Sequence, residues 1–108
     1  MWTGVDLDGT LAESPSPHGA ADHIGAPVIP MLMRVKEWLR QGREVRILTA
    51  RAYPPGDASA YQVDLVKAWC RKYVGRTLPV TCMKDHDMDV LYDDRAVQVI
   101  HNTGELVK

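Results

Sequence analysis

Two aspartates, Asp6 and Asp8, stand two positions apart where an apolar run meets a Gly-Thr turn, in the stretch Val5-Asp6-Leu7-Asp8-Gly9-Thr10-Leu11. If a strand ends here, the chain breaks at Gly9, and the two carboxylates converge on one point above the sheet edge. Close carboxylates disfavour each other's ionised form, and a divalent cation with oxygen ligands removes that conflict. Mg2+ typically takes one or two carboxylates plus a substrate phosphate, so the stretch indicates a magnesium site.

A second acidic pair, Asp93-Asp94, follows another apolar run near the C-terminus, Val90-Leu91-Tyr92. Two strand ends that both finish in carboxylates are interpreted as two halves of one metal site. The stretch does not fit a calcium-binding EF-hand loop, because the glycine of that loop would fall on Leu11 and its closing glutamate on Pro17. The remaining alternative is an acidic turn that caps a helix. A helix cap does not need a tight apolar strand before it, so the strand favours the metal site.

The composition is that of one globular domain. The chain has 108 residues and a net charge of −1, so no global basic field draws it to nucleic acid. No run approaches the roughly 20 apolar residues of a membrane span, and no signal peptide is visible. The two cysteines, Cys70 and Cys82, fall on expected core elements and are interpreted as buried, reduced thiols. These features together predict a cytoplasmic protein without a membrane partner.

Apolar periodicity predicts an alternation of strands and helices. Strands are expected over residues 2–7, 44–48, 78–82 and 88–93, and helices over 30–41 and 59–74. Ser59 and Gln62 form a capping box that opens the second helix. Residues 97–100 are an antiparallel edge strand, a bent continuation or a helix, and their Val/Ile content favours a strand.

Each expected helix has one apolar stripe. The stripe of the first helix comprises Val28, Leu32, Val35 and Leu39. That of the second comprises Leu65, Trp69 and Tyr73, with Tyr61. Such spacing is typical of a buried helical face rather than of a stacking platform for ligands.

Residues 12–27, which we call the flap, are rich in proline and glycine and longer than most connections. Long loops in small domains are often lids, so we expect the flap to cover Asp6 and Asp8. The flap contains His18 and His23, each either a substrate contact or a solvated side chain.

This alternation predicts an α/β fold with a mainly parallel sheet and helices on both faces. Ligands of such sheets bind outside the carboxyl ends of the strands. Polar or charged residues follow four of the expected strands at this edge: Asp6 and Asp8, Thr49 and Arg51, Lys84, and Asp93 and Asp94.

These four positions resemble the haloacid dehalogenase-like (HAD) superfamily of phosphohydrolases. The first motif of that family, D-x-D-G-T, is matched by residues 6–10, and the second, a Thr or Ser that ends a strand, by Thr49. Lys84 is the candidate for the third motif, and Asp93-Asp94 matches the acidic pair of the fourth. The region around Asp93-Asp94-Arg95 also looks like the phosphatase domain of polynucleotide kinases, and the whole chain looks like small phage and bacterial HAD-like proteins. The resemblance implies a HAD-like Rossmannoid three-layer sandwich.

The resemblance also implies roles for these residues. Asp6 would be the nucleophile that forms an aspartyl-phosphate, and Asp8 the general acid and base. Thr49 would bind a phosphoryl oxygen, and Lys84 would balance charge. Mg2+ would be held by Asp6, by Asp8 through its backbone carbonyl, and by the acidic pair, with Asp94 as the direct ligand and Asp93 bridged by water.

Residues next to these motifs are candidate substrate contacts: Gly9, Thr10, Ala50, Arg51, Arg95 and His23. Arginine matches phosphate geometry with two parallel hydrogen bonds. The alternative for Arg51 and Arg95 is a structural ion pair with Asp93, Asp94 or Glu44.

The chain has no room for the cap domain that most HAD phosphatases carry, so an open site is expected. An open site suits nucleotides, nucleic-acid ends or sugar phosphates, or a cap supplied by an oligomeric partner. The sequence therefore predicts a Mg2+-dependent phosphomonoesterase. Two alternatives stay open: a non-catalytic binding protein on the same scaffold, and a module that processes nucleic-acid ends.

Overall fold

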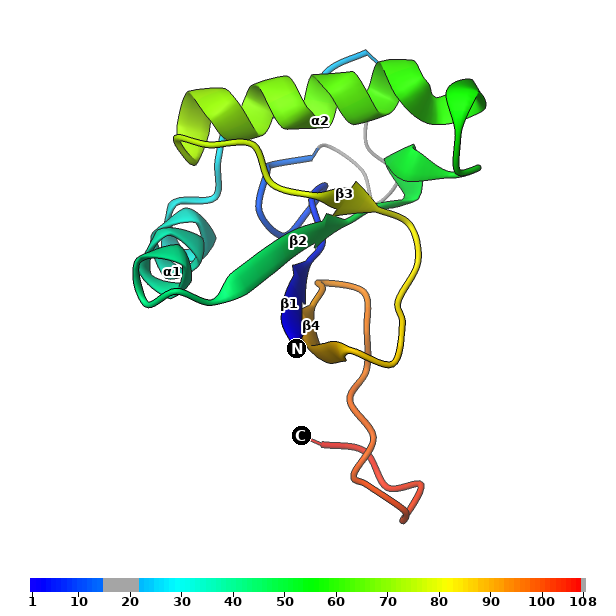
Figure 1. Cartoon of the computed structure of the whole chain (residues 1–108). Coiled ribbons are helices and arrows are strands. Elements are labelled where there is room, and N and C mark those ends of the chain that lie inside the picture. The colour runs from blue at the N-terminus through cyan, green and yellow to red at the C-terminus, as the bar shows by residue number, and fades with distance from the viewer. Residues whose placement is uncertain (15–21, 108) are drawn as a thin grey trace.

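Strands and helices alternate along the computed structural model of the chain, which describes residues 1–14 and 22–107 (Figure 1). The strands are β1 (Trp2–Val5), β2 (Glu44–Leu48), β3 (Val80–Thr81) and β4 (Met88–Tyr92). The helices are α1 (Ile29–Arg40) and α2 (Ala60–Tyr73), with the short 3-10 turns η1 (Ala50–Ala52) and η2 (Asp57–Ser59) between β2 and α2. No helix among these residues is long and apolar enough to cross a membrane.

The four strands form one parallel sheet in the order β3-β2-β1-β4. Val5 pairs with Ile47 of β2 on one side and with Tyr92 of β4 on the other. The carboxyl ends of all four strands therefore meet at the same edge of the sheet, which confirms the expected parallel α/β architecture.

Both helices pack against the same face of the sheet. Val5, Val45 and Ile47 point to this face and share one apolar core with residues of both helices. The core side chains of the helices are Leu32, Val35 and Trp38 from α1 and Val66, Trp69 and Cys70 from α2.

The expected three-layer arrangement is therefore absent from the described residues. The connections from β1 to β2 and from β2 to β3 step in the same direction across the sheet, and right-handed crossovers then place both helices on one face. The return connection from β3 to β4 spans only residues 82–87, which contain no helix. On the uncovered face, Trp2 is still buried, because the Arg46 guanidinium lies 4.6 Å from its ring centroid and its Nε1 donates to Asp85.

The two apolar stripes are shifted from those expected. In α1 the buried side chains include Trp38, while Leu39 is only half-buried, as is Val28 just before the helix. In α2, Val66 and Cys70 are buried with Trp69. Leu65 and Tyr73 are half-buried, and Tyr61 is exposed.

The capping box is also absent. The hydroxyl of Ser59 donates to the carbonyl of Ala52 instead of capping α2, and the Gln62 amide accepts from Arg51. Both side chains therefore form hydrogen bonds with residues outside α2.

The described ends of the flap are fastened to the core. Ala12 and Pro27 form an antiparallel bridge, and Glu13 N donates to Ala26 O. On the other side, Trp69 Nε1 donates to the carbonyl of Gly25 at 2.9 Å. His18 lies outside the described residues.

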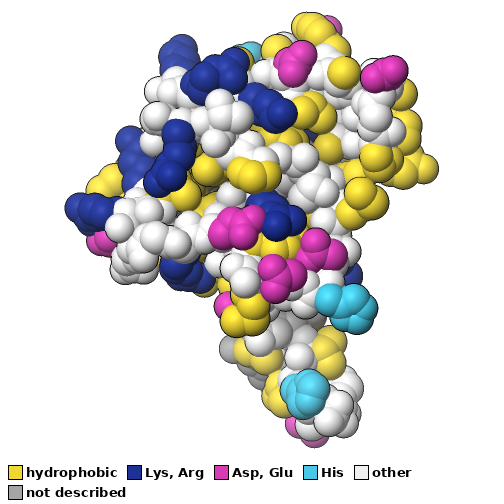
Figure 2. Space-filling model, in the orientation of Figure 1, with side chains coloured by type: hydrophobic (Ala, Val, Ile, Leu, Met, Phe, Trp, Pro, Cys, Tyr) yellow, Lys and Arg dark blue, Asp and Glu magenta, His cyan; other side chains and the backbone are white. Residues whose placement is uncertain are grey.

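Residues 97–100 do not join the sheet. They belong to a segment that we call the C-terminal arm (residues 96–107), in which Val99 and Leu106 form an isolated antiparallel bridge. The arm projects from the body, and Figure 2 shows hydrophobic side chains along it. Its exposed apolar residues are Val97, Val99, Ile100, Leu106 and Val107. The Lys and Arg side chains gather elsewhere in the same view, over α1 and the last turns of α2.

Candidate functional site

The acidic residues that follow β1 and β4 meet at the carboxyl edge of the sheet. Val5 is paired with Tyr92, so Asp6 and Asp93 leave the sheet at the same level. The amide of Asp6 also donates to the carbonyl of Tyr92 at 2.9 Å. One carboxylate oxygen from each of Asp6, Asp93 and Asp94 lies within 4.8 Å of the other two. We call these three residues the acidic triad; two are half-buried, and Asp94 is exposed.

A tight turn after Asp6 holds the loop against the triad. Leu7 and Leu11 are fully buried, and the Leu7 carbonyl accepts backbone amides from residues 10, 11 and 12. Gly9 has a φ of 90°, and a Cβ at this position would lie 2.6 Å from Asp94 Oδ2. Glycine is therefore needed here both for its backbone conformation and for the space beside Asp94.

Thr10 ties the two halves of the triad together. Its Oγ1 lies 3.2 Å from Asp6 Oδ2 and 2.9 Å from Asp94 Oδ1, so one hydroxyl proton is shared between two carboxylates. The same oxygen accepts the backbone amide of Asp94 at 2.9 Å. A threonine expected to contact substrate thus also positions the acidic residues.

The surroundings of Asp6 raise its pKa from 3.8 to about 7. Burial is the main cause, because it penalises the charged form, followed by hydrogen bonding with Asp94 and the negative charge of Asp93. The Thr10 hydroxyl acts in the opposite direction. A nearby cation would reverse this balance in favour of the ionised carboxylate.

Asp8 is not a member of the acidic triad. Its carboxylate accepts two hydrogen bonds from Arg51, from Nε at 2.7 Å and from Nη2 at 2.9 Å, and both side chains are nearly buried. The Arg51 guanidinium also donates to Gln62 Oε1 and to the carbonyl of His23, each at 2.8 Å. Arg51 therefore joins the first motif, α2 and the flap.

The alternative expected for Arg51 was a structural ion pair. Arg51 does form an ion pair, but its partner is Asp8 rather than Asp93, Asp94 or Glu44. Asp6 and Asp8 diverge to different partners instead of converging on one point, because Asp8 follows the buried Leu7 and meets the guanidinium that follows β2.

The other predicted residues lie around this centre. Thr49 is buried at the end of β2, and its hydroxyl accepts the amide of Arg51. Ala50 begins η1 and is exposed. His23 is exposed and, with Gly9, lines an open hollow beneath the described ends of the flap.

Two predicted cations form no ion pair or hydrogen bond with the triad through their side chains. Lys84 is exposed on the link after β3, and within the described part of the chain it forms no ion pair or hydrogen bond. The backbone amide of Arg95 donates to Asp93, but its side chain has no ion pair with the described residues.

Sequence reasoning missed the role of Gln62. Its place three residues after Ser59 favours a helix cap, and no local signal predicts that its amide supports Arg51 from α2.

The donor chemistry of the acidic triad fits magnesium. The three groups are all carboxylates, which are hard oxygen ligands, and their mutual repulsion is the conflict that a divalent cation relieves. Comparison of the chain with protein-family models, with curated proteins and with solved structures found no match.

Proposed function

We propose that this chain is a Mg2+-dependent phosphohydrolase of the HAD type that acts on phosphomonoesters. The observation that carries the proposal is the acidic triad, in which Asp6 of the D-x-D-G-T motif lies beside the acidic pair that follows β4. Three further motif positions at the same sheet edge, Asp8, Thr49 and Lys84, support it, although Lys84 forms no ion pair or hydrogen bond with the triad.

The reaction begins with attack by one carboxylate oxygen of Asp6 on the phosphorus of the substrate. A bond forms between that oxygen and phosphorus, and the bond from phosphorus to the leaving oxygen breaks. Asp8 gives a proton to the leaving oxygen, which departs as an alcohol. Asp8 then takes a proton from water, whose oxygen attacks phosphorus and releases phosphate and free Asp6.

Mg2+ bound by Asp6, Asp93 and Asp94 would neutralise charge on the nucleophile and on the phosphoryl group. Thr10 holds Asp6 and Asp94 beside each other, because its hydroxyl is hydrogen-bonded to both carboxylates. Thr49 offers its hydroxyl to a phosphoryl oxygen from the neighbouring strand. Phosphoryl transfer depends mostly on such positioning and charge neutralisation.

Arg51 has to change partner during this cycle. While its guanidinium donates two hydrogen bonds to Asp8, both oxygens of that side chain are occupied as acceptors. A substrate phosphate offers the same bidentate geometry. Transfer of Arg51 from Asp8 to the phosphate would therefore free Asp8 to act as the acid.

Phosphate release from a panel of phosphomonoesters tests the proposal. Activity should require Mg2+ and be abolished by EDTA, and Asp6→Asn should lower kcat by at least about a thousandfold, as expected for loss of a nucleophile. Asp89→Asn removes an exposed carboxylate from β4 and should leave kcat within about twofold. Full activity in Asp6→Asn, or no activity in folded, Mg2+-loaded wild type, would contradict the proposal.

One observation favours a second candidate, a non-catalytic binding protein on the same scaffold. The carboxylate of the proposed acid, Asp8, is paired with the guanidinium of Arg51. If this candidate is correct, Asp6→Asn retains ligand binding while neither it nor the wild type releases phosphate.

A further inference from the structure

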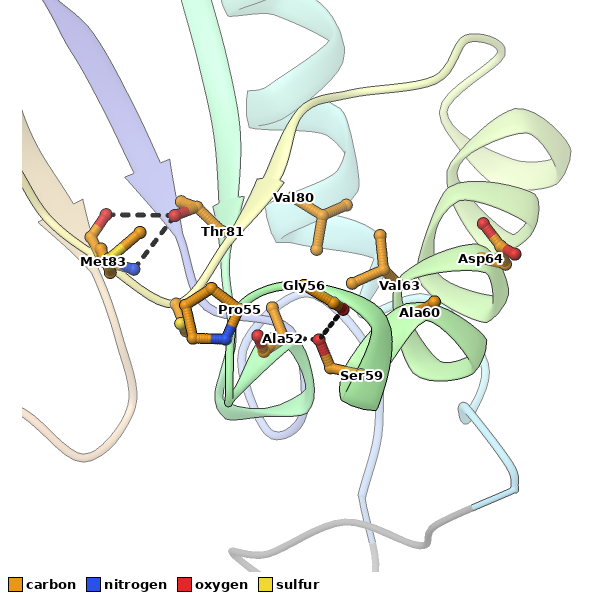
Figure 3. Close-up of a pocket in the computed structure, with 11 residues that line it drawn as sticks. Ala52, Pro55, Gly56, Ser59, Ala60, Val63, Asp64, Val80, Thr81 and Met83 are labelled. Carbon is orange, nitrogen blue, oxygen red and sulfur yellow. Dashed lines mark hydrogen bonds between the residues drawn. The ribbon is translucent and has the colours of Figure 1, made fainter.

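A cavity of about 330 Å³ lies at the carboxyl end of β3, where the first turns of α2 and the turns η1 and η2 meet the sheet (Figure 3). Its volume falls within the range of about 300–1,000 Å³ that is common for small-molecule sites. Val63 of α2 and Val80 of β3 face each other across it, and Met83 lies at the end opposite to Asp64.

Thr49, which is part of the proposed phosphate site, is hydrogen-bonded through its backbone to two residues that line the cavity. The amide of Thr49 donates to the carbonyl of Thr81, and its own carbonyl accepts the amide of Ala52, and both partners line the cavity. The acidic triad lies on the other side of β2, at the ends of β1 and β4. Two strand spacings, about 10 Å, separate the end of β1 from the end of β3.

The walls are mostly apolar, and their polar groups already have partners. Ser59 Oγ donates to Ala52 O, and Thr81 Oγ1 both accepts from and donates to the backbone of Met83. Among the described residues, no Lys or Arg lines the cavity, and Asp64 is the one charged residue that does. A second phosphate would meet the Asp64 carboxylate and no cation. A neutral group would suit the apolar walls, and a hydrogen-bond donor on it could bind Asp64.

We propose that this cavity binds the organic part of the substrate, and that this part is a nucleoside whose base enters between β3 and α2. A flat and largely apolar base suits the walls, its amino group suits Asp64, and the sugar provides the spacer between base and phosphate. This inference rests on the proposed phosphatase function, which it extends to a substrate class.

The kinetic test fills the cavity without touching the acidic triad. Ala60→Phe places a ring in the cavity from the exposed start of α2, and Ala68→Phe makes the same change at an exposed position of that helix outside it. Ala60→Phe should lower kcat/KM for nucleoside monophosphates by at least about tenfold and leave that for glycerol phosphate within about twofold. Ala68→Phe should change neither. Phenyl phosphate, compared in the same series, separates a nucleoside from any aromatic alcohol.

The binding test does not depend on catalysis. Cys82 lines the cavity and is half-buried, whereas Cys70 is buried in the core, so a thiol reagent reports on Cys82. A free nucleoside, which carries no phosphate, should slow labelling of Cys82 in wild type and in Ala68→Phe, but not in Ala60→Phe.

The two tests separate the two proposals. Protection of Cys82 without any phosphate release leaves the cavity assignment standing and overturns the phosphatase. Phosphate release with no protection by nucleosides, and with equal effects of Ala60→Phe on nucleoside and glycerol phosphates, overturns the cavity assignment alone. A phenyl phosphate kcat/KM that matches that of nucleoside monophosphates, with the same sensitivity to Ala60→Phe, overturns the choice of a nucleoside.

Discussion

Asp6 and Asp8 are separated by a single residue, yet they have opposite electrostatic surroundings. Asp6 faces two other carboxylates and a shared hydroxyl, and its pKa is raised to about 7. Asp8 faces a guanidinium that holds it with two hydrogen bonds. The proposed roles need the reverse, an ionised nucleophile at Asp6 and a proton donor at Asp8, so a cation beside Asp6 and the release of Arg51 from Asp8 would both be required.

The raised pKa of Asp6 predicts a pH-dependent stability in the metal-free protein. Because the folded value of about 7 exceeds the unfolded value of 3.8, the contribution of Asp6 is fully present below pH 3.8 and is lost as the pH rises through about 7. In EDTA, the Tm of Asp6→Asn should therefore rise relative to the wild type between pH 5 and pH 8. Thermal unfolding by circular dichroism at each pH measures this difference.

Two controls sharpen that comparison. Asp89→Asn, which changes an exposed carboxylate on β4, should show no such trend across the same pH range. Mg2+ added at pH 8 should raise the Tm of the wild type more than that of Asp6→Asn, because an ion that binds only the folded state stabilises it by mass action. Parallel pH curves for wild type and Asp6→Asn in EDTA would contradict the assigned environment of Asp6.

At the scale of the elements, α1 is held to the sheet by a narrow stripe. Leu32 is 7% exposed and lies in the core, whereas the next side chain, Met33, is 62% exposed. Leu32→Ala should destabilise the protein by about 2–5 kcal/mol through lost burial and the cavity left behind. Met33→Ala should change the free energy of unfolding by less than about 0.5 kcal/mol. Urea denaturation of both variants measures the contrast, and equal effects would mean that α1 does not pack as described.

The elements themselves were largely predictable from the sequence, because their apolar periodicity is local. The strand over residues 44–48 has the expected bounds. Apart from residues 97–100, each other predicted strand or helix begins and ends within two residues of its expected bounds. The stripe of α2 was not predictable in detail. Leu65 and Tyr73 are eight residues apart, and Val66 and Cys70 are four apart. Both intervals return to one face of a helix, so only packing against the sheet decides which pair is buried.

The contacts of the site depend on residues far apart in the sequence, which explains the remaining errors. Ser59 and Gln62 match a capping pattern, but Ala52 and Arg51 compete for them in the folded chain. The acidic triad was foreseeable because two adjacent parallel strands both end in carboxylates. The partner of Asp8 was not, because nothing in the local sequence indicates that Arg51 reaches across to it.

At the scale of the whole molecule, the layer structure follows from strand order rather than from local pattern. Both helices cover one face, and the short link over residues 82–87 returns the chain to the opposite edge. The expectation of a three-layer sandwich failed because that link contains no helix. The C-terminal arm then leaves the sheet edge, with hydrogen bonds between its own residues such as Val107 to Gln98.

The arm should therefore contribute little to the stability of the body. Its apolar side chains are 42–67% exposed, so deleting residues 97–108 removes little buried surface. We expect the free energy of unfolding to change by less than about 1 kcal/mol, as measured in urea for the chain with and without these residues. A loss of several kcal/mol would show that the arm packs on the body or on a second copy, and the dependence of the Tm on protein concentration would separate those cases.

The hydrogen bond from Trp69 to the carbonyl of Gly25 gives the chain an optical reporter on one fastened end of the flap. All three tryptophans are largely buried, and the other two have different partners: Trp2 donates to Asp85, and the Trp38 ring packs against Tyr92. In a protein that carries Trp2→Phe and Trp38→Phe, the remaining indole emission would come from Trp69 alone. Any ligand that pulls Gly25 away from α2 would expose that ring to water, so a red shift of the fluorescence would reveal the movement without an added dye.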